Sequence, residues 1–99
     1  MAKNKVIILP RAQQDIEKAY EYISQTLMNP KSADELIAII QNKLRLLKDM
    51  PKMCPVVKLS GLTNTFRKCV INNFIIFYTI NKETAEIQVA RFYYGKKEY

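Results

Sequence analysis

The stretch Phe74-Ile75-Ile76-Phe77-Tyr78-Thr79-Ile80 decides the fold of this chain. Side chains alternate between the two faces of a strand, and here both alternating sets are apolar apart from Thr79. A strand of this kind is covered on both sides, at least in a complex. We therefore expect residues 74–80 to form the central strand of a sheet.

The segments on either side of this strand predict its neighbours. Asn72-Asn73 precedes it and Asn81–Thr84 follows it, and both are turn signals because Asn tolerates positive φ. The turns connect it to β-type runs over Phe66–Ile71 and Ala85–Tyr94. This half of the chain is therefore predicted to be a three-stranded antiparallel meander.

The N-terminal half has a different pattern. Lys5–Leu9 is a short apolar run that predicts a strand, and Pro10 suits the first turn of a helix. Apolar residues then recur with helical spacing to about Met28, and again from the Asn29-Pro30 break to about Asp49. The link between these helices is so short that they must form an antiparallel hairpin.

Two local features bound the second helix. Asn29 is a candidate N-cap with a proline after it, while Ser32 followed by Glu35 offers a competing capping box. After the helix, Pro51–Asn64 is predicted to be mostly irregular, with a short extended segment over Val56–Leu59.

Together these elements predict a small α+β domain that spans residues 1–99. The chain has 99 residues, of which 48% are hydrophobic, so it can bury one core but not two. An N-terminal strand must rejoin the sheet across the helical hairpin. We expect one domain with a single sheet.

The charge is concentrated in the sheet half. The chain carries a net charge of +7, with 8 basic and 6 acidic residues in the first fifty and 8 basic and 3 acidic residues in the rest. This excess favours an anionic partner such as nucleic acid, a ribosome or an acidic protein. The basic and aromatic residues of this half are Lys58, Phe66, Arg67, Lys68, Arg91, Phe92, Tyr93, Tyr94, Lys96, Lys97 and Tyr99. The alternative is that the rings belong to the core and the lysines protect strand ends from aggregation.

Arg91 is the most informative of these residues. Alternation along the last strand places it on the face that carries Ile87 and Val89. A charge there is either paired or directed at a ligand. A pairing partner would be Glu86 or an acid of the first helix, but we expect a ligand contact.

Several residue types are absent or sparse. The chain has no His, which excludes His-based metal sites and Ser-His or Cys-His catalysis, and we expect neither metal nor cofactor. Cys54 and Cys69 lack a CxxC spacing and are predicted to be reduced, buried thiols, with a disulfide as the less favoured alternative. With neither a signal peptide nor a run of about 20 apolar residues, we expect a cytoplasmic protein that does not contact the membrane.

The order of several short motifs resembles that of RelE/ParE-type toxins. These motifs are Pro10–Ile16, Tyr20–Ile23, Asn29-Pro30, the second helix ending in Leu47 and Pro51, Phe66–Lys68, Asn73–Tyr78 and Val89–Lys97. The resemblance covers almost the whole chain. It implies a compact antiparallel sheet packed on a helical hairpin, as the residue patterns do independently.

The resemblance also implies a function. Such a toxin is half of a type II toxin–antitoxin pair, as in plasmid stabilization, and a small acidic antitoxin neutralises it in a hetero-oligomeric complex. RelE-like members cut mRNA on the ribosome, whereas ParE-like members inhibit DNA gyrase. The resemblance leaves Arg67, Lys68, Arg91, Tyr93, Tyr94, Lys96 and Lys97 as the candidate catalytic or target-binding residues. A nucleic-acid-binding module without toxicity is the alternative from another class.

Departures from the nuclease pattern favour the ParE-like branch. The arginine of the central strand is replaced by Ile75, and the histidine near the end of the last strand by Tyr93 or Tyr94. Of the two strand lysines, one falls at Cys69 and the other at Arg67. Tyr94 beside Arg91 and Lys96 could still exchange a proton with RNA, so the mRNA endonuclease reading remains the alternative.

The antitoxin is expected to cover apolar surface. An amphipathic helix or an added strand would dock on the sheet or on the helical hairpin. Without this partner, the toxin would expose apolar patches and tend to self-associate.

Overall fold

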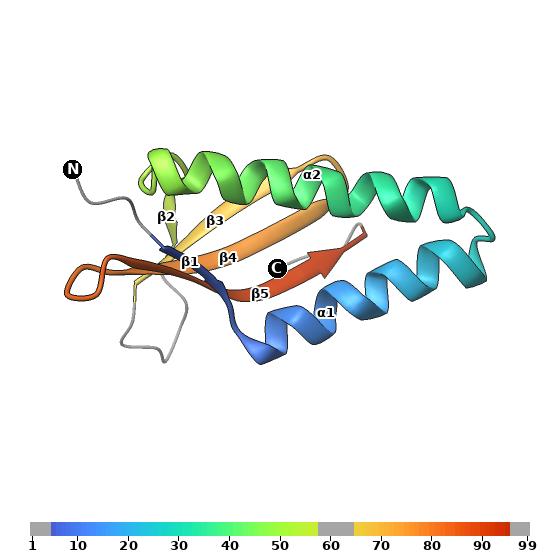
Figure 1. The fold of residues 1–99 in the computed structure, drawn as a ribbon, viewed down its shortest axis with the longest axis horizontal. Coiled ribbons are helices and arrows are strands. Elements are labelled where there is room, and N and C mark those ends of the chain that lie inside the picture. The colour runs from blue at the N-terminus through green and yellow to red at the C-terminus, as the bar shows by residue number, and fades with distance from the viewer. Residues whose placement is uncertain (1–4, 58–64, 96–99) are drawn as a thin grey trace.

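The computed structural model describes residues 5–57 and 65–95, and their strands form one mixed sheet (Figure 1). The strands are β1 (Lys5–Ile8), β2 (Val56–Val57), β3 (Phe66–Ile71), β4 (Phe74–Asn81) and β5 (Glu86–Tyr94), in the spatial order β1-β5-β4-β3-β2. β1 is parallel to β5, and the other neighbours are antiparallel. The predicted α+β architecture, with an N-terminal strand that rejoins the meander, is confirmed.

β4 occupies the centre of the sheet, as its two-sided apolarity predicts. Phe74, Ile76 and Tyr78 are buried against the helices, while Ile75 and Phe77 on the opposite face are 9% and 7% exposed. Asn72 adopts a φ of +50° in the turn before β4, a conformation that Asn tolerates well.

The helical hairpin consists of α1 (Pro10–Glu21), a π-helical turn η1 (Tyr22–Thr26) and α2 (Pro30–Asp49). α1 and α2 run back and forth along one side of the sheet in Figure 1. The apolar stripes of both helices join the core beneath them, through Ile16, Leu36 and Leu47 among others. The Asn29 side chain caps α2 by accepting a hydrogen bond from Ser32 N–H, so Asn29 rather than the Ser32 capping box begins the helix.

The last strand differs from its prediction at Ala90. Phe77 pairs with Arg91 and Tyr78 pairs with Val89, so Ala90 is a β-bulge without a partner on β4. Beyond the bulge the alternation is reversed, and Phe92 rather than Arg91 joins Ile87 and Val89 in the core. The expectation that Arg91 and Tyr93 share a face with Ile87 and Val89 is therefore wrong.

The two faces of the sheet carry different sets of residues. The helix-side face carries Cys69, Ile76 and Phe92, which lie in the core with the helices. The open face carries the residues that alternate with these, including Lys68, Phe77, Arg91, Ile75 and Tyr93.

Candidate functional site

Arg91 is paired within its own chain. Its Nε lies 2.8 Å from Oδ2 of Asp15 in α1, and its Nη2 lies 3.3 Å from Oδ1. The backbone N–H of Phe92 also donates to Oδ2, at 3.1 Å. The sequence left two alternatives for Arg91, a pairing with an acid or a contact with a ligand. The structure shows the pairing, with an acid of the first helix, so the expectation of a ligand-directed arginine is wrong.

The path of the chain explains why Asp15 reaches this position. β1 pairs with β5 only as far as Val89, and Leu9 N–H donates to Val89 O at the end of this ladder. Pro10 then starts α1 directly, which lays the helix along the outer edge of β5. In a longer β1, a backbone carbonyl would accept a hydrogen bond from the Phe92 N–H. Here the Asp15 carboxylate accepts it instead.

The electrostatics of the pair favour its charged form. Burial alone would raise the pKa of Asp15, but the hydrogen bonds from Arg91 and Phe92 outweigh this effect and lower it. Conversely, the hydrogen bond to Asp15 raises the pKa of Arg91. The side chains are 33% exposed for Arg91 and 18% exposed for Asp15, so the pair lies near the surface and remains within reach of a ligand.

Arg91 also belongs to an aromatic cluster on the open face. Its guanidinium carbon lies 4.9 Å from the centroid of the Tyr93 ring, a cation–π distance. Tyr93 in turn meets Phe77 edge to face, with centroids 5.7 Å apart. Lys68 faces Phe77 from the other side, on β3. The predicted residues Lys68, Arg91 and Tyr93 are therefore brought together.

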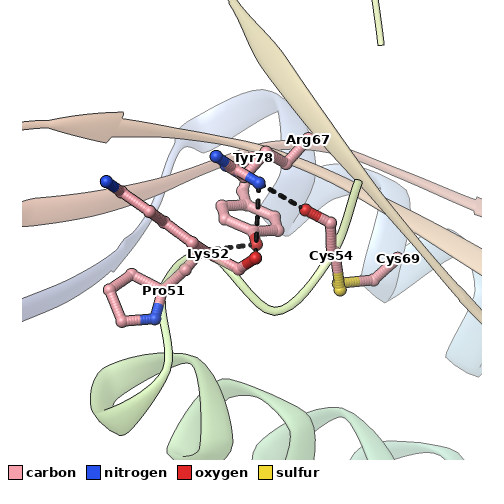
Figure 2. The surroundings of a disulfide bond; sticks show 6 residues. All are labelled: Pro51, Lys52, Cys54, Arg67, Cys69 and Tyr78. Atoms are coloured by element: carbon pink, nitrogen blue, oxygen red, sulfur yellow. Dashed lines mark hydrogen bonds between the residues drawn. A yellow bond between two sulfur atoms is a disulfide. The ribbon is translucent and has the colours of Figure 1, made fainter. Parts of the chain in front are cut away.

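Arg67 lies on the opposite face. It pairs with Tyr78, which is fully buried on the helix-side face. Its Nη1 donates to Cys54 O at 2.6 Å and to Lys52 O at 3.4 Å, as Figure 2 shows. This arginine therefore holds the segment that links α2 to β2, and it does not converge with Arg91.

The cysteines form a disulfide in the same region (Figure 2). Cys69 in β3 is bonded to Cys54, and the two are 2% and 8% exposed. The prediction of reduced thiols is therefore wrong, although both side chains are buried as expected. The two cysteines are 15 residues apart in sequence, and they meet because the segment leading into β2 runs antiparallel beside β3.

Tyr94 is separated from Arg91 by the strand alternation. It pairs with Phe74 and packs partly buried against the core, on the helix-side face. Both residues nevertheless border one groove along the outer edge of β5. The predicted residues Lys96 and Lys97 lie outside the described residues.

This groove, which we call the α1–β5 groove, has a volume of about 630 Å³. Its lining includes Asp15, Lys18, Tyr22, Leu27, Arg91, Phe92 and Tyr94. Tyr22 and Leu27 are 47% and 50% exposed, which is a large exposure for apolar side chains. Tyr22 starts η1, and single π-helical turns are frequent at functional sites.

Sequence reasoning did not single out Asp15, Lys18, Tyr22 or Leu27 as site residues. A signal for Asp15 was available, since α1 begins immediately after a strand that must lie in the sheet. Within residues 5–57 and 65–95, no three His, Cys, Asp or Glu side chains gather to hold a metal ion. No helix in the same ranges is long and apolar enough to cross a bilayer.

Comparison with solved structures defines the class of fold. A chain of the chromosomal ParDE toxin–antitoxin system from Pseudomonas aeruginosa superposes with a TM-score of 0.74 and 16% identity, covering 95% of this chain and 98% of that chain. A chain of the toxin–antitoxin complex RelBE2 from Mycobacterium tuberculosis gives a TM-score of 0.63 and 13% identity, covering 94% and 99%. At such low identity these matches establish the fold alone.

The family follows from the sequence itself. The model of the ParE toxin of the type II toxin–antitoxin system parDE matches residues 6–99. The chain therefore belongs to the ParE toxin family, as the order of its motifs suggested. A search of curated protein sequences gives no significant match.

Proposed function

We propose that this toxin inhibits DNA gyrase by binding to it, and that it does not cut RNA. The observation that carries the proposal is the separation of its two strand arginines. Arg67 and Arg91 lie on opposite faces of the sheet, and each is held by groups of its own chain.

RNA cleavage through the 2′-OH requires several groups around one phosphate. A base must activate the hydroxyl, cations must stabilise the charged intermediate, and an acid must protonate the leaving oxygen. The open-face cluster offers Lys68, Arg91 and Tyr93, which are two cations and one phenol. The chain has no His, and the position on the central strand where the nuclease pattern has an arginine is occupied by the buried, apolar Ile75. This set suits recognition of an anionic surface better than proton transfer.

Two assays on purified toxin test the target. We expect inhibition of gyrase supercoiling and intact mRNA on stalled ribosomes. Arg91→Lys should weaken the inhibition while it retains the charge, because Lys lacks the planar fork that binds Asp15 and a ligand together. Cleaved mRNA together with unaffected gyrase would replace this proposal by the RelE-like endonuclease. No effect in either assay would favour a non-toxic binding module.

We propose that a cognate antitoxin, a small acidic protein, occupies the α1–β5 groove. The Phe92 N–H points into the groove at Asp15, and strand alternation turns the backbone of Tyr94 to the same side. Past Val89 this edge faces no neighbouring strand in the described part of the chain. An added strand or helix would cover Tyr22 and Leu27, and acidic side chains would meet Lys18.

Affinity measurements on the toxin and antitoxin test this location. Leu27→Asp should weaken binding about tenfold or more, because it places a charge in an apolar contact. Val70→Asp is the matched control, since Val70 is 65% exposed on the distant strand β3. Equal affinities for both variants and the wild type would move the antitoxin to another surface.

A further inference from the structure

The segment between α2 and β2 is held on the sheet by an unusual set of contacts. Among residues 50–57, all of which the structure describes, only Cys54 has a buried side chain. Met50, Met53 and Val56 are 51%, 39% and 47% exposed, so the segment gains little from apolar burial. The disulfide to Cys69 is therefore its main side-chain anchor.

The remaining contacts of this segment use its backbone. The hydroxyl of Tyr78 donates to Pro51 O at 2.7 Å, and the N–H of Lys68 donates to Pro55 O at 3.0 Å. Arg67 donates to the carbonyls of Cys54 and Lys52. Among the residues that the structure describes, β2 contributes the two pairs Val56–Arg67 and Val57–Phe66.

We propose that Cys54–Cys69 is a redox latch that controls the release of Arg67. With the disulfide intact, residues 50–57 stay on the sheet and their carbonyls occupy the Arg67 guanidinium. With both cysteines reduced, the segment opens and Arg67 becomes available to an anionic target.

The chemistry is an exchange with a dithiol. One thiolate of the reductant attacks a sulfur of the disulfide and expels the other cysteine as a thiolate, which takes up a proton. The second thiol of the reductant then resolves the mixed disulfide. The protein gains two electrons and two protons as a pair of thiols, and the reductant becomes a disulfide.

Burial makes this exchange depend on motion of the segment. Both cysteines are nearly inaccessible, at 8% and 2% exposure, so the reductant must wait for a local opening. Once the bond is broken, the segment is held by a small buried thiol, by the hydrogen bonds that Arg67, Tyr78 and Lys68 donate to its carbonyls, and by the short β2 ladder. Residues 50–57 therefore stay on the sheet while the disulfide is intact and leave it once the disulfide is reduced.

Other cationic side chains lie near Arg67. Arg67 borders a polar cavity of about 730 Å³ at the end of the sheet, where Lys52 and Lys82 also lie. Among the described residues of its lining, Glu83 is the one acid. A freed guanidinium offers a planar fork of donors that suits phosphate or carboxylate groups. Its partner class is accordingly an anion.

Hydrogen exchange on the purified chain tests the latch, with dithiothreitol as the reductant. After reduction, amides in residues 50–57 and the Lys68 amide should exchange faster by a factor about tenfold or more above the acceleration of the α1 amides, which follow global stability alone. The Nε–H signal of Arg67 in NMR spectra should shift at the same time. A Cys54→Ser/Cys69→Ser variant should resemble the reduced protein and ignore dithiothreitol. If it does not fold, reduced wild-type protein gives the same comparison.

Two results would overturn the latch. Equal exchange of residues 50–57 in both states would show that the disulfide restrains nothing locally. Uniformly faster exchange of the whole chain would show that it only supports global stability.

The link to toxicity rests on the proposed gyrase target and is tested separately. Reduced toxin should inhibit supercoiling about tenfold more strongly than oxidised toxin, and Arg67→Gln should abolish the difference. Equal inhibition by both forms would refute the role of Arg67. Inhibition by neither form, with the exchange difference intact, would refute the proposed target and leave the latch in place.

Discussion

Replacing Arg91 by Ala should lower the stability of this protein measurably, because the ion pair with Asp15 ties α1 to β5. A hydrogen bond to a charged group contributes about 1.5–3 kcal/mol, and the exposure of Arg91 brings the expected loss down to about 1 kcal/mol. In a domain of this size, a loss of this order lowers Tm by about 4–8 °C. Replacing Asp15 by Ala should cost more, about 2 kcal/mol, because the Phe92 N–H also loses its acceptor.

A double-mutant cycle monitored by calorimetry provides the measurement. The double variant should lose about 1 kcal/mol less than the sum of the single variants, since either change already removes the pair. Arg45→Ala is the matched control, because Arg45 is exposed on α2. If Arg91→Ala leaves Tm where the control leaves it, Arg91 does not stabilise the fold, and a loss of toxicity in that variant would reflect direct target contact alone.

Three further changes probe the same structure. The pKa of Asp15 in the folded protein lies below its ordinary value of 3.8. The stabilisation by the Asp15 carboxylate is therefore complete above pH 3.8 and is lost as the pH falls through the lower, folded-state pKa. Urea unfolding at a series of acidic pH values should show this loss in the wild type but not in Asp15→Asn. Cys69→Ser should lower the unfolding free energy by about 3 kcal/mol, the chain-entropy value for a loop of this length, and an unchanged urea midpoint would contradict it. Tyr78→Phe should cost about 1 kcal/mol because Pro51 O loses its donor, whereas Tyr20→Phe, which removes only an exposed hydrogen bond, should cost less in the same assay.

Local signals were sufficient to predict most of the fold. The two-sided apolarity of β4 requires cover on both faces, which only a central strand obtains. Asn29 and Asn72 mark a helix start and a tight turn because their side chains and backbone suit those positions. These features depend on neighbours in sequence, and the chain carries them explicitly.

The site was harder to predict because it depends on one bulge and one long-range bond. Nothing about Ala90 distinguishes a bulged residue from an ordinary strand residue, yet its insertion moves Arg91 and Tyr93 to the open face. The disulfide depends on the pairing of the segment around Cys54 with the edge of β3, and residues 50–57 carry no periodic pattern that predicts this pairing. Reasoning from the cellular compartment therefore predicted thiols where the structure has a bond.

These two departures together bear on how the toxin works. If β5 ran without its bulge, Arg91 would share the helix-side face with Arg67, and both would compete for space with the core. The bulge instead sends Arg91 to the open face, while the Cys54 carbonyl retains Arg67 on the other. A catalytic site needs its charges around one phosphate, whereas a binding protein gains by presenting charges on two sides to a large partner. The separation of the two arginines thus favours a toxin that grips an extended anionic surface, with the Asp15–Arg91 pair at the β5 end of the sheet and Arg67 beside the disulfide segment at the β3 end.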